Sequence, residues 1–272
     1  MTPRRLAREL GILLGVLLAL AAAAFAAQRL FFPVRTASPD VPRALDDALA
    51  PLVRQQVRAS QKVIDEPLVT EAFSRIMGRL LPALPGGGSS GPRIDVLVVD
   101  SADVNAFTLP GGLICVDTGL ICALPSAEEM AGVLGHELSH AVSRDPLALL
   151  ARHVGLATLL NAVSGGQGGA VMGSVVQEMV SVRYGREAED RADAFSVDLL
   201  ARAGIQPRSF ARALAHIRDA APRRPDLLKY LDPHSPIDRR IARAEEQARK
   251  EKAASRPLEV NWNAMVESLP AK

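Results

Sequence analysis

The chain has 272 residues, 48% of them hydrophobic and 23% charged, a composition too apolar for a disordered protein and suited to one compact domain with short appendages. Its net charge of +2 excludes a strongly basic nucleic-acid binder and an acidic tail protein, so we expect no nucleic-acid partner. Aromatic residues are only 4% of the chain, while alanine, leucine and arginine are abundant, which favours a helix-rich architecture.

The N-terminus has the features of a membrane anchor or an export signal. Residues 1–9 form a basic region with three arginines, and an uninterrupted apolar run follows from Leu10 to Ala27. This run is at the short end of the roughly 17–25 residues that cross a bilayer. The arginines before it predict a cytoplasmic N-terminus and export of the rest. We assign residues 10–29 to a transmembrane signal anchor, with a cleaved signal peptide as the alternative because Ala24-Phe25-Ala26 offers a cleavage site.

A linker at residues 30–42 leads to the first predicted helices and strands. Residues 43–60 and 65–83 carry apolar side chains at helical spacing, and a Gly-rich segment at 85–92 then breaks the chain. Short β-branched runs predict strands at 94–99 and 112–116, and a third strand within 105–112 that ends in a turn. We therefore expect a small sheet of about three strands. The two cysteines, Cys115 and Cys122, allow a single disulfide or two free thiols.

The second half of the chain is predicted to be helical. Ser126 and Glu129 form a capping box that opens a helix to about Arg144, in which Glu129 would reach back to the cap. A hydrophobic stretch at 146–163 leads to a Gly-rich loop at 164–169 that could act as a lid. A long helix is expected over 171–203, ended by Gly204, and Pro207 and Pro236 each open a further helix.

The predicted helix after Ser126 contains a metal-binding pattern. His136 and His140 are four residues apart, so both imidazoles lie on one helical face and can converge on one ion. Glu137 lies beside that face, where it can take a proton from a bound water. Neutral imidazole and carboxylate ligands suit zinc, and a catalytic zinc site needs three protein ligands and one open position.

A pattern of acidic residues on the later helix complements the histidine pattern. Glu189 and Asp193 are again four residues apart and share a face. One of them can complete the zinc ligands, while the other accepts a hydrogen bond from a ligating histidine and fixes its tautomer. Alone, such a cluster is more often a solvated helix surface, but the histidine motif favours the functional interpretation.

The residues from Tyr184 to Asp193, followed by Ala203-Gly204 and Pro207, resemble the second zinc motif of metallopeptidase family forty-eight. The resemblance covers roughly residues 65–245. It implies that Glu189, rather than Glu187, is the third zinc ligand and that Asp193 is the hydrogen-bonding partner of a ligating histidine. Asn105-Ala-Phe and the residues from Gly111 to Leu120 also resemble the edge strand of that family and the turn after it.

A further segment, from His234 to Ile241, resembles a His-Pro motif of the same family. The chain keeps the histidine and the arginine six positions later, Arg240, but has Ser235 before Pro236. The resemblance implies that His234 reaches the zinc site, where it either stabilises the oxyanion or plugs the site at rest. Arg240 would contribute oxyanion or structural support.

These observations together predict an α+β, mostly helical, zincin-like (gluzincin) domain at residues 43–254, with a small mixed sheet, an HExxH helix and a tail at 255–272. The expected function is that of a zinc metalloendopeptidase with one Zn²⁺ per chain, which hydrolyses peptide bonds of misfolded or misassembled envelope proteins in quality control. An extended polypeptide substrate would add to the edge strand formed by Asn105, Ala106, Phe107 and Thr108. The expected location is the bacterial inner membrane, single-pass, with the catalytic domain in the periplasm, or else the soluble periplasm after cleavage.

Three alternatives remain open at this point. The chain could be an exported zinc-binding chaperone or assembly factor with latent proteolysis. It could be a prenyl-type protease with its site inside the membrane, although the sequence has one terminal apolar run. It could be a zinc aminopeptidase, which would need a separate acidic anchor for the substrate amine. The sequence predicts neither the oligomeric state nor the substrate.

Overall fold

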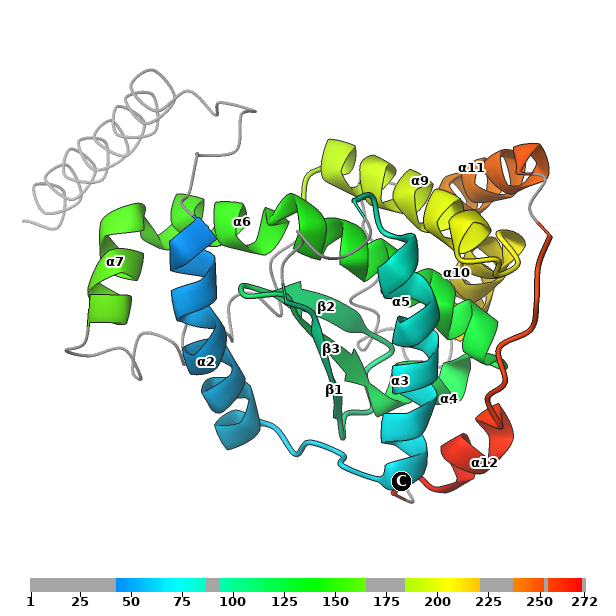
Figure 1. The fold of residues 1–272 in the computed structure, drawn as a ribbon, viewed down its shortest axis with the longest axis horizontal. Helices are drawn as coiled ribbons and strands as arrows, with labels where there is room; N and C mark the ends of the chain where they lie inside the picture. The colour runs from blue at the N-terminus through cyan, green and yellow to red at the C-terminus, as the bar shows by residue number, and fades with distance from the viewer. Residues whose placement is uncertain (1–42, 87–92, 165–183, 221–236, 252–253, 271–272) are drawn as a thin grey trace, which may run out of the picture. The chain divides into compact units, whose positions relative to one another are not determined.

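The computed structural model describes residues 43–86, 93–164, 184–220, 237–251 and 254–270, and these form helices around a sheet of three strands (Figure 1). The predicted anchor at 10–29 and the linker at 30–42 lie outside the described residues. The strands are β1 (Asp95–Val99), β2 (Ala106–Leu109) and β3 (Leu113–Asp117). The helices are α2 (Arg43–Ser60), α3 (Pro67–Leu80), the short η1 (Leu81–Ala83), α4 (Thr118–Ala123), α5 (Ala127–Ser143), α6 (Asp145–Val154), α7 (Leu156–Ser164), α9 (Arg186–Arg202), α10 (Arg208–Ala220), α11 (Ile237–Lys250) and α12 (Trp262–Glu267).

The sheet has the order β1-β3-β2, with β3 in the centre. β1 runs parallel to β3, and β2 runs antiparallel to it, so the predicted small mixed sheet is confirmed. Gly111 and Gly112 form the turn between β2 and β3 with φ angles of 79° and 73°, which L side chains rarely adopt. A Cβ atom at Gly111 would also lie 2.4 Å from the Cβ atom of Ala50, so this turn needs glycine to let α2 approach.

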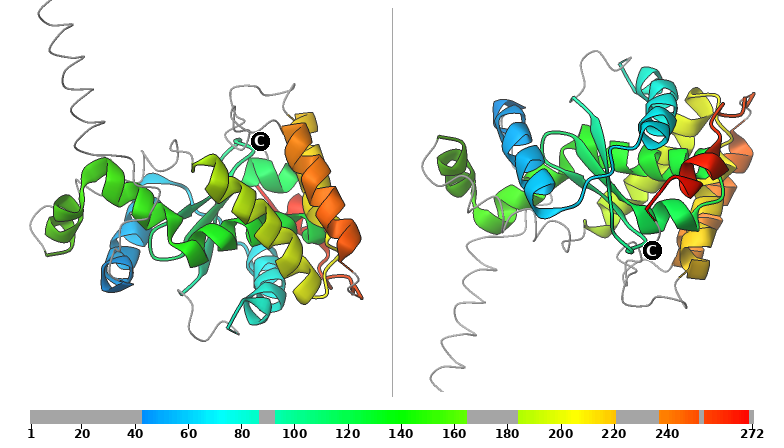
Figure 2. Two further views of the ribbon diagram at one scale, coloured as in Figure 1. Left: turned by 90° about the horizontal axis from the view of Figure 1, so that it is seen from above. Right: turned by 90° about the horizontal axis from the view of Figure 1, so that it is seen from below.

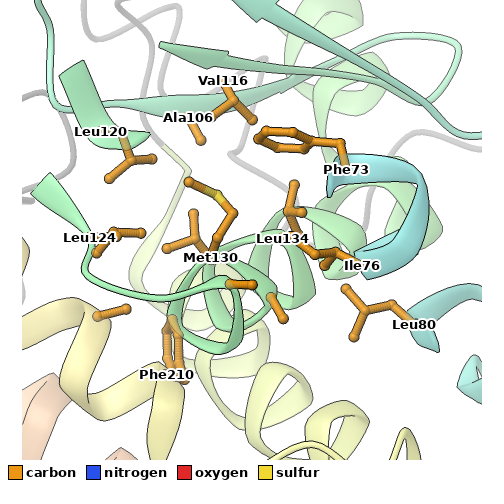
Figure 3. Close-up of a cluster of buried hydrophobic side chains, with 14 of the residues drawn as sticks. Phe73, Ile76, Leu80, Ala106, Val116, Leu120, Leu124, Met130, Leu134 and Phe210 are labelled. Atoms are coloured by element: carbon orange, nitrogen blue, oxygen red, sulfur yellow. The ribbon is translucent and has the colours of Figure 1, made fainter. Parts of the chain in front are cut away.

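Helices cover both faces of the sheet. Successive strand residues point to opposite sides, and buried apolar side chains lie on each side. One face carries Val98, Ala106, Ile114 and Val116, which pack with α3 and α5 into the main core; Figure 3 shows Ala106 and Val116 above Met130 and Leu134. The opposite face contributes to a second cluster with α2, α6 and α7, through Leu97, Val99, Leu113 and Cys115. Both cysteines are free thiols, Cys115 buried and Cys122 exposed.

α5 is the central helix, because α9 and α10 pack closely against it. A Cβ atom at Gly132 would lie 2.7 Å from the Cα atom of Phe210 on α10, and one at Gly135 would lie 3.0 Å from the Oγ atom of Ser196 on α9. Ser196 donates a hydrogen bond of 2.6 Å to the carbonyl of Gly132. α11 packs in turn on α9 and α10, and Figure 2 shows these three helices side by side. The two glycines thus allow α9 and α10 to approach α5 closely.

The predicted start of α5 is confirmed, with one difference in the cap. The Ser126 hydroxyl accepts a hydrogen bond from the main-chain N–H of Glu129. The carboxylate of Glu129 does not turn back to the cap but points to α10, where His216 lies 2.7 Å and Arg212 lies 3.4 Å away. The structure also places α4 directly after β3, which the sequence did not predict. Gly155, with a φ of 83°, divides the hydrophobic stretch at 146–163 into α6 and α7.

The prediction of one unbroken helix over 171–203 is wrong at residues 184 and 185. α9 begins at Arg186, and its N-cap, Gly185, has an extended conformation with φ −68° and ψ 155°. The hydroxyl of Tyr184 donates a hydrogen bond to the Thr108 carbonyl, and its ring stacks on His140. These tertiary contacts hold the chain extended where the local pattern favours helix. The rest of the predicted helix before residue 184, and most of the Gly-rich loop, lie outside the described residues.

Residues 255–270, which belong to the segment 255–272 predicted as a tail, pack against the main core. Trp262 is 6% exposed, and its indole N–H donates to the Leu124 carbonyl over 2.8 Å. The main-chain N–H of Leu258 donates to the Glu128 carboxylate over 2.8 Å. Figure 1 shows α12 next to α3. Throughout the described ranges, no helix combines the length and the apolar character that crossing a membrane requires.

Candidate metal centre

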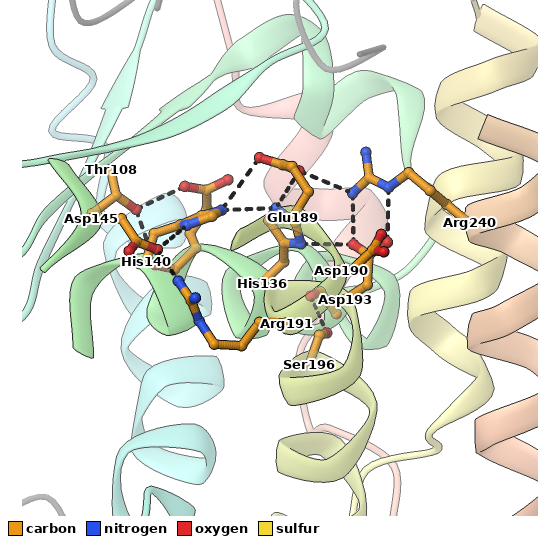
Figure 4. A network of polar contacts seen from close by, with 12 residues as sticks. Thr108, His136, His140, Asp145, Glu189, Asp190, Arg191, Asp193, Ser196 and Arg240 are labelled. Carbon is orange, nitrogen blue, oxygen red and sulfur yellow. Dashed lines mark hydrogen bonds and ion pairs between the residues drawn. The ribbon is translucent and has the colours of Figure 1, made fainter. Parts of the chain in front are cut away.

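Three predicted ligands come together between α5 and α9. His136 and His140 project from successive turns of α5, and their Nε2 atoms are 3.2 Å apart. Glu189, in the first turn of α9, places one carboxylate oxygen 3.5 Å from Nε2 of His136 and the other 3.7 Å from Nε2 of His140. Figure 4 shows the three side chains facing one another. Within the described residues they form a group able to hold a metal ion.

The spacing of these atoms fits a four-coordinate ion. Imidazole nitrogens and carboxylate oxygens bind such an ion at about 2.1 Å, and tetrahedral geometry then places ligand atoms about 3.4 Å apart. The two Nε2 atoms are 3.2 Å apart, and the Glu189 oxygen nearest to each lies 3.5 or 3.7 Å away, distances close to that value. Both histidines are almost fully buried, and Glu189 is 14% exposed. The donor set and its geometry therefore suit a divalent metal ion.

The other ring nitrogens of both histidines face carboxylates. Nδ1 of His136 lies 3.0 Å from Oδ1 of Asp193, and Nδ1 of His140 lies 2.8 Å from Oδ2 of Asp145. An ionised carboxylate only accepts hydrogen bonds, so these partners assign the ring protons to Nδ1. The two Nε2 atoms then present lone pairs to each other at 3.2 Å, an arrangement that a cation between them stabilises.

Arg240 on α11 anchors the first of these carboxylates. Its Nε and Nη2 atoms donate to the two oxygens of Asp193 over 2.9 and 2.7 Å, and the arginine is 1% exposed. Burial alone would raise the pKa of Asp193, but hydrogen bonds with His136 and Arg240 hold that pKa well below its usual range. Burial would lower the pKa of His136, yet the hydrogen bond to Asp193 and the charge of Glu189 raise it. Arg240 also lies 3.7 Å from Glu189.

Glu137 is buried beside the histidines and is held by the sheet. The Thr108 hydroxyl on β2 donates to Oε2 of Glu137 over 2.7 Å, and it also lies 3.0 Å from the Glu137 carbonyl. Burial raises the pKa of Glu137, while His136, His140 and the Thr108 hydrogen bond act in the opposite direction. An oriented carboxylate with a raised pKa can accept and return a proton.

The predicted substrate strand, Asn105 to Thr108, lies at one edge of the sheet. The Asn105 carbonyl accepts a hydrogen bond from the main chain of Asp117, so this residue points inward to β3. Because main-chain groups alternate along an antiparallel strand, those of Ala106 and Thr108 point to the side of β2 that faces away from β3. The Thr108 carbonyl there accepts the hydrogen bond from Tyr184, at 3.3 Å. Phe107 is half-buried and packs against the second cluster.

Sequence reasoning missed Asp145, Arg191 and Tyr184. Asp145 follows His140 by five residues, and helical spacing would not bring it back to the histidine. Arg144 makes this possible, since its left-handed backbone, with a φ of 57°, turns the chain directly after α5. Arg191 pairs with Asp145 over 2.6 Å, and the Tyr184 ring centroid lies 4.0 Å from that of His140. His234, by contrast, lies outside the described residues.

Comparisons with known proteins bear on this site. The chain is 30% identical to metalloprotease YcaL of Escherichia coli over 139 residues, which are 49% of the chain and 54% of YcaL. It is 37% identical to the mitochondrial metalloendopeptidase OMA1 of Arabidopsis thaliana over 118 residues, which are 42% of the chain and 24% of that protein. It is 26% identical to the beta-barrel assembly-enhancing protease of Yersinia pestis over 179 residues, which are 61% of the chain and 36% of that protein.

The matched part thus spans about half the length of these relatives, or less. Residues 70–248, which include the three clustered side chains and all their carboxylate and arginine partners, match peptidase family M48. A match that covers more than half of the chain is sufficient to assign the chain to a family. The chain belongs to peptidase family M48.

Proposed function

We propose that the chain is a zinc-dependent metalloendopeptidase of the gluzincin type, with His136, His140 and Glu189 as ligands of one zinc ion. The observation that carries this proposal is that two Nε2 atoms 3.2 Å apart face the Glu189 carboxylate, whose two oxygens lie 3.5 and 3.7 Å from them, while carboxylates contact the other nitrogen of each histidine. Two nitrogens and one carboxylate oxygen leave a fourth position for water, which is typical of catalytic zinc sites. Family membership and the metalloprotease names of the relatives support the same activity.

The residues of the chain would divide the chemistry among them. When bound, zinc supplies a Lewis acid that polarises the scissile carbonyl and lowers the pKa of the attacking water to about 7. Glu137 would take the proton of that water and return it to the leaving nitrogen. The Thr108 hydroxyl fixes the Glu137 carboxylate through Oε2 and leaves Oε1 for the proton. Asp193, backed by Arg240, would hold His136 in the tautomer that binds through Nε2.

The substrate would be an extended polypeptide that pairs with the edge of β2. The main-chain groups of Ala106 point to that edge and can exchange hydrogen bonds with a peptide strand. Thr108 both borders this edge and contacts Glu137, so a strand bound there would pass close to the proposed general base. The oxyanion or plugging role predicted for His234 stays a prediction.

We further propose that the substrates are misfolded or misassembled envelope proteins, with the catalytic unit in the periplasm and the N-terminal segment in the inner membrane. The Yersinia relative is named for enhancing β-barrel assembly, which supports a function in the envelope. Cleavage of the N-terminal segment would give a soluble periplasmic enzyme instead.

Glu137→Gln tests the proposal. The ligands remain and only the base is lost, so the full-length variant should keep one zinc per chain while its cleavage rate on unfolded casein falls by about 10²–10⁴. A chelator should abolish wild-type cleavage, and added zinc should restore it. Cleavage by the variant at the wild-type rate would contradict the role of Glu137. A zinc-loaded wild-type chain that cleaves nothing but suppresses aggregation would favour the chaperone alternative.

A further inference from the structure

His140 has its own carboxylate partner, supplied by a different helix. Asp145 is the first residue of α6, and its Oδ2 atom lies 2.8 Å from Nδ1 of His140. The carboxylate is 12% exposed and the histidine 1% exposed, so water competes little for this contact. The hydrogen bond fixes both the ring tautomer and the direction in which Nε2 points.

The turn between α5 and α6, which positions Asp145, is held by contacts with residues outside these two helices. Arg144, with its left-handed backbone, lies 3.4 Å from Oδ2 of Asp46 on α2. Oδ1 of the same aspartate accepts a hydrogen bond of 2.7 Å from the main-chain N–H of Gly111, in the turn after β2. The turn between α5 and α6 is therefore tied to α2 and to the sheet, and it directs residue 145 at His140.

Arg191 connects this carboxylate to the third proposed ligand. It lies on α9, two residues after Glu189, and its Nη2 atom is 2.6 Å from Oδ2 of Asp145 (Figure 4). The oxygen that contacts His140 is thus the one that Arg191 holds. The contacts join α6 to α5 and α9, the two helices that carry the three proposed ligands.

The same order of groups occurs at His136. There Asp193 contacts Nδ1, and Arg240 holds Asp193. The two arrangements differ in burial, because the side chain of Arg240 is 2% exposed and that of Arg191 is 47% exposed. Asp145 therefore depends less on its arginine than Asp193 does, since an exposed pair contributes little.

We propose that Asp145 is a positioning residue for His140 and that Arg191 holds Asp145 in place, so that both proposed zinc histidines are oriented by arginine-bound carboxylates. This inference rests on the proposed function, because it assigns Asp145 and Arg191 to the metal centre. A competing explanation is that Asp145 only stabilises the N-terminus of α6, where a negative charge is favourable. That explanation predicts a change in stability and none in metal affinity.

The test is a zinc competition titration of the full-length protein against a chromogenic chelator. Asp145→Ala should weaken zinc binding by about 10–100-fold, the usual effect of losing such a partner. Asp145→Asn keeps the side-chain shape and a neutral acceptor, so its affinity should lie between those of the wild type and Asp145→Ala. It also carries the test if the alanine variant fails to fold. Arg191→Gln should weaken binding less, and it should add little in the Asp145→Ala background because both act through one contact.

Asp190→Asn is the matched control. Asp190 lies next to Glu189 on α9 and also pairs with an arginine, Arg243 on α11, at 2.8 Å. It lies outside the contacts described for the two histidines, so its variant should bind zinc as the wild type does. The cobalt-substituted protein gives a second readout, since the visible spectrum reports ligand geometry and should change in Asp145→Ala but not in Asp190→Asn.

The outcomes are distinguishable. Zinc affinity within twofold of the wild type in Asp145→Ala, with an unchanged cobalt spectrum, would overturn the positioning role even if the metal-free protein becomes less stable. Equal losses in Asp145→Ala and Asp190→Asn would overturn it as well, since they would report a general disturbance of α9. A wild-type chain that binds no zinc would overturn the proposed function itself, and with it this inference.

Discussion

At the scale of single residues, the site depends on which oxygen or nitrogen each side chain presents to the centre. His136 and His140 each use one ring nitrogen for a carboxylate and direct the other at Glu189. Glu137 lies between them in the sequence, and its carboxylate instead accepts a hydrogen bond from the Thr108 hydroxyl. Adjacent residues of one helix therefore have different tasks because neighbouring elements engage them differently.

The choice of third ligand gives a prediction at this scale. Glu189→Gln should lower zinc affinity by well over tenfold, because an amide is a poorer ligand than a carboxylate. Glu187→Gln is the control, since Glu187 is exposed in the first turn of α9 and should leave affinity unchanged. Competition titration of both variants measures the difference. Equal losses, or the reverse order, would show that the third ligand is assigned to the wrong glutamate.

At the scale of elements, β3 is buried along its whole length. Cys115 on this strand is fully buried, and burial raises the pKa of its thiol well above the ordinary value, with the charges of Asp117 and Glu137 adding to the effect. A raised thiol pKa means that the folded state keeps the proton. The contribution of this group to stability is therefore present below the pKa of an unfolded cysteine, about 8.5, and is lost as pH rises above it.

Thiol labelling tests this environment. In the native protein at pH 8, iodoacetamide should modify the exposed Cys122 and leave Cys115 unmodified, because the thiolate is the reactive form. Peptide mass spectrometry after a timed reaction gives the two rates. Unfolding in denaturant should make Cys115 react as well, which serves as the positive control. Rapid native labelling of Cys115 would show that β3 is accessible to solvent and contradict the burial of this thiol.

The helices show where local patterns are sufficient and where they are not. The start of α5 follows from Ser126, and α3 begins with Pro67, a favoured first helical residue. The break before α9 follows from contacts that Tyr184 makes with β2 and α5, which local propensity does not contain. The boundary set by the Ser126 cap was therefore predictable, and the boundary set by the contacts of Tyr184 was not.

At the scale of the whole molecule, the C-terminal segment closes the main core. Trp262→Ala should lower the free energy of unfolding by about 3–5 kcal/mol, the usual cost of removing a buried aromatic side chain. Trp262→Phe keeps much of the apolar contact and loses the hydrogen bond to Leu124, so it should cost less. Urea unfolding followed by circular dichroism measures both. A negligible effect of the alanine variant would mean that residues 254–270 contribute little to the domain.

The orientation in the membrane is a second prediction at this scale. A reporter enzyme that is active only in the periplasm, fused after residue 60, should be active, because the arginines before the apolar run favour a cytoplasmic N-terminus. A reporter that works only in the cytoplasm should be inactive at the same junction. The opposite pair of results would reverse the orientation and place the substrates in the cytoplasm or inner membrane.

Features that depend on short-range spacing follow from the order of the amino acids. Histidines four residues apart on a capped helix must share a face, and Glu189 and Asp193 must share another, so the residues of the candidate site could be predicted from spacing, while the choice of Glu189 as third ligand came from the family resemblance. The groups that meet across different elements are known from the fold alone. Asp145 reaches His140 through the left-handed turn at Arg144, Thr108 reaches Glu137 from the sheet, and Trp262 reaches Leu124 from 138 residues away. Such contacts depend on how helices and strands pack together, and packing is a property of the assembled core that no local pattern encodes.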